Sequence, residues 1–161
     1  MLGTAESVFV PLVADLSHPA CSPTDRKHAL FIIDDFLEFC GLPEGVSPFY
    51  VEWVPHLLSC ASPECEAGLR QAAVYGLGMA AEVGGAHFSQ FAGSAVEALA
   101  SVIAHHEAYA PGNEIATDNA IHAMGKIAAY QDGSHGVNAS VLFPEWLKHR
   151  AFSISVALLL K

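Results

Sequence analysis

The sequence is poor in positive charge, which limits the kinds of partner it can bind. It has 7 lysines and arginines against 17 aspartates and glutamates, for a formal net charge of −10 at pH 7. We expect no nucleic-acid partner, because the phosphates would be repelled rather than neutralised. A basic protein is the partner that this charge favours.

The sequence also lacks an apolar run of the roughly 18–20 residues that a membrane span needs. The apolar segment AFSISVALLL at 151–160 has only ten residues. The first residues include Glu6 and no basic region of the kind that opens a secretory signal. The cysteines show no disulfide-framework spacing; they are Cys21, Cys40, Cys60 and Cys65. We therefore expect a soluble intracellular protein with free thiols and no membrane partner.

Strand-like alternation of useful length is missing, and helical spacing takes its place. Hydrophobic residues make up 52% of the chain and charged residues 15%, so most segments should bury one face. Apolar residues recur every three or four positions, as on one face of an α-helix, in 25–40, 47–60 and 86–106. Serine followed by proline predicts helix starts at 22–23, 47–48 and 62–63, and Gly84-Gly85 predicts a helix end.

Three segments of the chain resemble one another. They are ALFIIDDFL (29–37), AVYGLGMAA (73–81) and AIHAMGKIA (120–128), which begin 44 and 47 residues apart. This spacing lies within the ~40–47 residues of helix-pair repeats. We predict an all-α, right-handed α-solenoid of about three helix pairs plus a partial one, in a single array over 1–161. Its parts are a partial repeat at 5–17, repeats at 23–60, 62–106 and 112–149, and an unmatched apolar tail at 150–161.

A glycine pattern in the second segment suggests a nucleotide site. Gly76, Gly78 and Ala81 have the G-x-G-x-x-A spacing of a dinucleotide-binding turn. That turn needs a strand before the glycines and a helix that begins at them. Here the preceding residues already have helical spacing, so the motif falls inside a helix. We interpret Gly76 and Gly78 as structural, because small residues let a neighbouring helix approach closely, and we expect no cofactor.

No arrangement of metal ligands stands out among the nine histidines and four cysteines. His105, His106 and His122 are the closest histidines, but adjacent residues point about 100° apart on a helix. Cys60 and Cys65 lack the second ligand pair that a zinc site needs. We therefore predict no metal site.

The carboxylates of Asp34, Asp35 and Glu38 could in principle form an acid–base pair. No histidine or serine lies at catalytic spacing nearby, and general acid–base work needs a perturbed group in a cleft. We interpret the three acids as a solvated ridge between buried apolar residues. The prediction is a protein without catalytic residues that is not an enzyme.

The stretch LRQAAVYGLG (69–78) resembles the A-helix signature of HEAT repeats, with Leu69-Arg70, Ala72-Ala73 and Leu77-Gly78 in register. A longer resemblance is to the importin-β (karyopherin) superfamily of nuclear transport receptors, and within it to the C-terminal part of the β3-type importins. Its four stretches occur in the same order and at similar spacing, over roughly 8–149. They are DRKHALFIIDDFLEFCG, RQAAVYGLGMAAEVGG, NEIATDNAIHAMGKI and LFPEWLKH.

This resemblance implies a protein-binding segment of a nuclear import receptor that carries basic cargo proteins through nuclear pores under Ran-GTP control. The implied partners are basic cargo such as ribosomal proteins and histones, the Ran GTPase and nucleoporins. The implied locations are the cytoplasm and the nucleus. The alternative is a HEAT-repeat scaffold or adaptor subunit unrelated to transport, which Ran-GTP-dependent binding would separate from a receptor.

The resemblance also implies roles for individual residues. Its B helices would grip cargo, so we expect possible protein contacts at Glu52, Trp53, Glu97 and Glu145, although core packing is the favoured role of the tryptophan. Arg70 resembles the family's repeated arginine and would bond structurally to an acidic or carbonyl group of a neighbouring repeat. Apolar faces at the ends of so short an array predict marginal stability or self-association through those ends.

Overall fold

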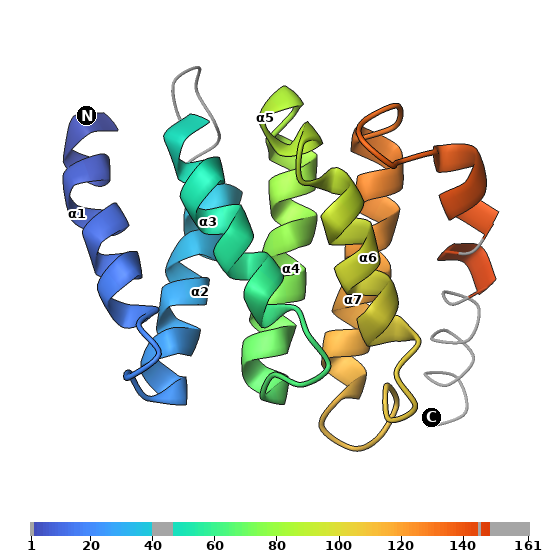
Figure 1. The fold of residues 1–161 in the computed structure, drawn as a ribbon, viewed down its shortest axis with the longest axis horizontal. Helices are drawn as coiled ribbons and strands as arrows, with labels where there is room; N and C mark the ends of the chain where they lie inside the picture. Colours follow the sequence, from blue (N-terminus) through green and yellow to red (C-terminus); the bar gives the residue numbers. More distant parts are fainter. Residues whose placement is uncertain (1, 40–46, 145, 149–161) are drawn as a thin grey trace.

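The computed structural model describes residues 2–39, 47–144 and 146–148, and its regular structure there is α-helical without a β-strand. Residues 139–144 and 146–148 are also helical. The helices that precede them in the chain are labelled in Figure 1. These are α1 (Leu2–Leu16), α2 (Pro23–Phe39), α3 (Ser47–Cys60), α4 (Ala67–Val83), α5 (Ala86–Ser89), α6 (Ala92–Ile103) and α7 (Glu114–Tyr130).

The helices pack in series as two layers (Figure 1). The A layer consists of α2, α4 and α7, with α4 packed between the other two. The B layer consists of α1, α3 and α6, and each of these packs chiefly on the A-layer helix that follows it in the chain. This arrangement confirms the predicted all-α solenoid. The division into repeats at the stated boundaries stays a prediction.

The start of α2 shows how the sequence fixes a helix end. The Ser22 hydroxyl accepts a hydrogen bond from the Asp25 backbone N–H at 3.1 Å, and the Ser22 backbone N–H donates to the Asp25 carboxylate at 3.3 Å. This reciprocal pairing is a capping box. Pro23 occupies the first helical position, where its missing N–H costs nothing. The helix start expected from Ser22-Pro23 is confirmed.

The helix start expected at Ser62-Pro63 is wrong. The helix α4 begins at Ala67, and the Glu66 side chain caps it by accepting from the Gly68 backbone N–H at 3.1 Å. The Ser62 hydroxyl instead accepts from the Glu64 N–H within a turn. This turn directs backbone carbonyls toward Arg70, which a helix beginning at Pro63 could not do.

The expected continuous helix over 86–106 is also divided. It forms α5 and α6, with Gln90 and Phe91 between them. The Phe91 N–H bonds to the Phe88 carbonyl at 2.8 Å, a three-residue spacing that tightens the chain at this point. The preceding helix end is as predicted, since α4 stops at Val83 and Gly85 has a φ of +48°.

The core runs without interruption between the two layers. Its largest fully buried side chains include those of Tyr50, Leu57, Leu77 and Leu99. Alanines occupy many of the remaining buried positions, which brings the helix backbones close together. The helices α4 and α7 approach closely at Gly78, where a Cβ would lie 3.0 Å from the Ala123 Cα.

Replacing Gly78 with alanine should therefore destabilise the protein. The new methyl would press on the α7 backbone, an overpacking cost of about 1–3 kcal/mol. That cost should exceed the roughly 0.5–1 kcal/mol that alanine gains in helix propensity. Urea unfolding followed by circular dichroism would measure the difference. The control is Gly68→Ala on the same helix, where a Cβ would meet only side-chain atoms, of Glu66 and Lys27, and no backbone. Equal stability of the two variants would contradict the prediction.

Candidate protein-binding surface

The predicted contact residues lie in two different environments. Glu52 on α3 and Glu97 on α6 are exposed, and these two B-layer helices are neighbours. Trp53 is only 3% exposed and its ring meets Phe36 edge-on, with centroids 5.2 Å apart. Glu145 lies outside the described residues. The structure therefore brings two of the carboxylates onto one layer and places the indole in the core, and the contact roles stay predictions.

Arg70 is a buried cation that bonds to oxygen atoms of three residues. It is 6% exposed. Its Nη1 donates to the carbonyls of Pro63 at 2.7 Å and Cys65 at 2.8 Å, and its Nη2 donates to the Asn113 side-chain oxygen. Asn113 immediately precedes α7, so this guanidinium connects α4, the turn before it and the start of the next A-layer helix. The acceptors are amide oxygens rather than carboxylates.

Gly76 lies in the middle of α4, facing α2 and α3. A Cβ there would fall 2.3 Å from an Asp34 carboxylate oxygen and 2.8 Å from a Leu57 methyl. Because α4 spans 67–83, the G-x-G-x-x-A pattern lies wholly inside a helix, where backbone N–H groups bond to carbonyls four residues back. The pattern does not form a phosphate-binding turn.

Asp34 is buried, so the predicted solvated ridge is wrong at this residue. Its side chain is 6% exposed, and its Oδ1 has no hydrogen-bond partner among the described residues. Burial, with smaller contributions from the carboxylates of Asp35 and Glu38, raises the pKa of Asp34 to about 8. One sequence signal could have found this: Asp34 follows Leu30 by four residues and precedes Leu37 by three, on one helical stripe.

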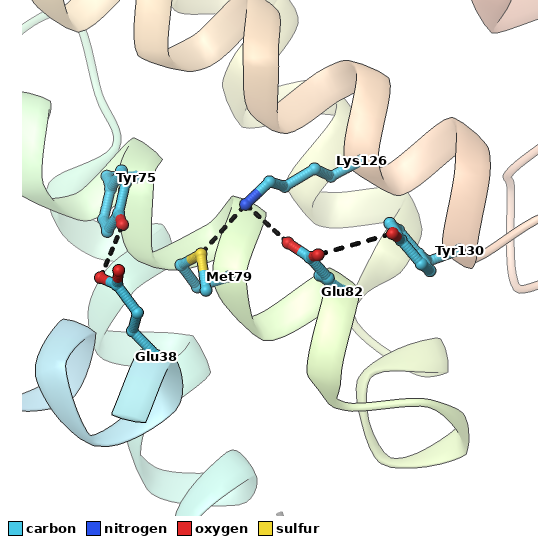
Figure 2. A network of polar contacts seen from close by, with 6 residues as sticks. All are labelled: Glu38, Tyr75, Met79, Glu82, Lys126 and Tyr130. Carbon is cyan, nitrogen blue, oxygen red and sulfur yellow. Dashed lines mark hydrogen bonds and ion pairs between the residues drawn. The ribbon is translucent and has the colours of Figure 1, made fainter. Parts of the chain in front are cut away.

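A network of polar side chains crosses the A layer at its surface (Figure 2). Tyr75 of α4 donates to the Glu38 carboxylate of α2 at 2.8 Å. Lys126 of α7 lies 2.7 Å from Glu82 of α4, and Tyr130 donates to Glu82 at 3.5 Å. The hydrogen bond to Glu38 is the main reason that the pKa of Tyr75 is raised to about 12. The ion pair is about one-third exposed, so its contribution should be below about 1 kcal/mol.

The histidines and cysteines that the structure describes do not assemble a ligand set. Within the parts of the chain that the structure describes, no three His, Cys, Asp or Glu side chains gather closely enough to hold a metal ion. The rings of His105 and His106 lie 4.3 Å apart after α6, whereas His122 lies within α7. Cys60 is buried at the end of α3. No helix in those same parts has the length and apolarity to span a bilayer.

Comparison with known proteins shows similarity to an importin homolog over most of the chain. No family model matches. The chain is 27% identical over 146 residues to a protein of Dictyostelium discoideum named as a probable importin-5 homolog. The similarity is to an importin. It covers 89% of this chain but only 14% of the relative, so the chain spans about one-seventh of the relative's length. The similarity supports the importin-β superfamily without narrowing it further, and the relative's name denotes an importin, not an enzyme.

Proposed function

We propose that this chain is a protein-binding segment of a nuclear import receptor that carries basic cargo proteins under Ran-GTP control and moves between cytoplasm and nucleus. The observation that carries the proposal is the 27% identity to an importin homolog over 146 residues. A serial packing of helices in two layers supports it, since such arrays bind proteins along extended surfaces. The relevant partners are basic cargo, Ran and nucleoporins.

The B layer is the proposed cargo-binding surface. Glu52 and Glu97 are exposed on neighbouring helices there, and the chain as a whole has a net charge of −10. Complementary charge steers a basic segment toward such a surface and fixes its register. Neither glutamate has a resolved ion-pair partner within the described residues, which leaves both carboxylates available to a lysine or arginine of the cargo.

Reversing both charges should weaken the binding of a basic peptide. We expect Glu52→Lys with Glu97→Lys to reduce the affinity for a lysine- and arginine-rich peptide by about 1–3 kcal/mol, or roughly 5- to 150-fold. Fluorescence anisotropy with a labelled peptide would measure it. The matched control is a second double charge reversal, Glu64→Lys with Glu107→Lys, at two exposed glutamates that lie outside the B-layer helices. Equal losses in both double variants would indicate only a net-charge effect and would reject the B layer as the cargo-binding surface.

Ran dependence separates a receptor from a scaffold unrelated to transport. The fluorescence-anisotropy measurement with the labelled basic peptide is repeated in the presence of Ran loaded with GTP and of Ran loaded with GDP. A receptor segment should release the basic peptide in the presence of the GTP form only, because an effector acts through differential affinity for two states. Binding that both forms leave unchanged would favour the scaffold function.

The N-terminal end of the A layer is the surface through which we propose self-association. A largely apolar cavity of about 340 Å³ lies between α1 and α2, and Phe39 is 74% exposed there. The cavity is lined by Phe9, Ile32, Phe36, Phe39 and one acidic residue, Asp35. We expect Phe39→Lys to reduce concentration-dependent association in analytical ultracentrifugation, because it places a charge on this apolar surface. The control is Ile115→Lys, at an exposed isoleucine of α7. An identical concentration dependence in both variants would exclude this surface.

A further inference from the structure

Two cysteine thiols lie next to the same residue at the end of α3. The Cys60 Sγ is 3.8 Å from the Ser59 Oγ, and the Cys65 Sγ donates a hydrogen bond to the Ser59 carbonyl at 3.6 Å. The chain turns back after α3, and the Cys65 backbone N–H donates to the Ser62 carbonyl at 3.0 Å. Both thiols are free, and thiols make only weak hydrogen bonds. Either sulfur can therefore leave Ser59 at little cost.

The two thiols differ in their access to solvent. Cys60 is fully buried, whereas Cys65 is partly exposed. Burial raises the pKa of the Cys60 thiol, its contacts with Ser59 and with Arg26 of α2 lower that pKa, and the Cys65 thiol raises it. The two thiols are therefore close enough to interact electrostatically. A dissolved oxidant meets Cys65 first, because oxidation depends on the exposure of the sulfur as well as on its thiolate character.

The turn that contains Cys65 connects the ends of α3 and α4 (Figure 1) and supplies acceptors to Arg70. The carbonyls of Pro63 and Cys65 both accept hydrogen bonds from the guanidinium, which also donates to Asn113 before α7. A covalent bond between Cys60 and Cys65 would close a ring around this turn. It would thereby restrict the movement of the carbonyls through which Arg70 connects α4 to α7.

We propose that Cys60 and Cys65 are an oxidation-sensitive pair that forms a disulfide within the chain when a hydroperoxide reaches Cys65. The Cys65 thiolate attacks a peroxide oxygen and breaks the O–O bond, which leaves a sulfenic acid on Cys65 and releases hydroxide that takes up the thiol proton. The Cys60 thiolate then attacks the Cys65 sulfur, the S–S bond forms, and the sulfenic oxygen leaves with a proton as water. With hydrogen peroxide, two thiols and one peroxide give one disulfide and two waters. A small dithiol restores both thiols by exchange.

Disulfide mapping tests the proposal directly. The full chain is treated with hydrogen peroxide, its remaining thiols are blocked with iodoacetamide, and the denatured product is cut by a protease that cleaves after glutamate. Because Glu64 lies between the two cysteines, cleavage there leaves residues 53–64 joined to residues 65–66 only through the disulfide. Mass spectrometry should find the joined peptides, and a dithiol should separate them. Iodoacetamide adducts on both Cys60 and Cys65 of the treated chain would overturn the proposal, as would a disulfide between two chains.

Variants and a denatured control show whether the fold creates the pair. Cys65→Ser should abolish the joined peptides, whereas Cys21→Ser, which removes another partly exposed thiol, should leave them unchanged. In urea the wild-type disulfide should form more slowly, because the fold no longer holds both thiols at Ser59. Equal rates with and without urea would mean that the cysteines pair only because they are close in sequence, and would overturn the role of the fold.

Proteolysis of the folded protein tests the effect on the turn. Glu64 is exposed within it, so the same protease can report on how often the turn opens. The oxidised chain should be cut after Glu64 more slowly than the reduced chain, and Cys65→Ser should be cut at the same rate before and after peroxide treatment. Equal cleavage of the oxidised and reduced wild-type chains would reject the conclusion that the disulfide restricts the turn.

Discussion

Raising the pH should destabilise the fold through Asp34. The buried carboxyl keeps its proton up to a pKa of about 8, whereas an unfolded aspartate ionises near 3.8. Between these two values the folded state holds one proton more than the unfolded state. The free energy of unfolding should therefore fall as the pH rises, by up to about 1.4 kcal/mol per pH unit, and level off above the folded pKa. Part of any measured slope will come from other groups, so a comparison variant is needed.

Asp34→Asn isolates this contribution. The amide cannot ionise, so the variant should lack the Asp34 part of the slope and exceed the wild type in stability by several kcal/mol at about pH 9. Urea unfolding at several values between about pH 5 and about pH 9 would give both profiles. Asp35→Asn is the matched control, because Asp35 is the exposed neighbour on the same helix. If the wild type and Asp34→Asn gave parallel profiles, Asp34 would not be protonated in the folded protein.

Replacing Arg70 with methionine, a side chain of similar length, should destabilise the protein more than replacing it with lysine. Methionine fills similar space but provides no donor, so the carbonyls of Pro63 and Cys65 and the Asn113 amide oxygen lose their partner. Leaving a buried acceptor without its hydrogen-bond partner costs about 1–3 kcal/mol for each group. Arg70→Lys should lose less, because it keeps the charge but not the planar fork that reaches several acceptors.

Thermal unfolding and limited proteolysis together test this. The variant should have a lower midpoint, and the turn before α4 should become the first site of cleavage. The control is Lys27→Met on α2, a partly exposed cation near the Phe31 ring. An Arg70→Met protein as stable as the control would show that the guanidinium contributes little to holding α4 against α7.

Local patterns predicted the helices well because apolar spacing is a property of each helix alone. The stripe through Ile33 and Leu37 predicts α2, and Ser22 predicts its start. The Ser62 signal failed because the backbone there bonds with a residue later in the chain. Asp34 was assigned to the surface by its residue type, yet the absence of a side chain at Gly76 lets α4 cover it. The Asp34–Gly76 contact joins two helices that are far apart in the sequence and leaves no mark in a short window of it.

The contact of α4 with α2 (the α2–α4 joint) and its contact with α7 (the α4–α7 joint) are stabilised differently. This difference has a mechanical consequence. The α4–α7 joint combines the close approach at Gly78 with the Glu82–Lys126 ion pair and a buried Gln131 amide that donates to the Ala81 carbonyl. The α2–α4 joint has the exposed Tyr75–Glu38 hydrogen bond, but in its interior the Asp34 Oδ1, which has no hydrogen bond within the described residues, lies opposite Gly76. Under a pulling or bending load the array should yield first between α2 and α4. A ligand that bent the array would then move α2 relative to α4, whereas α4 and α7 would move together.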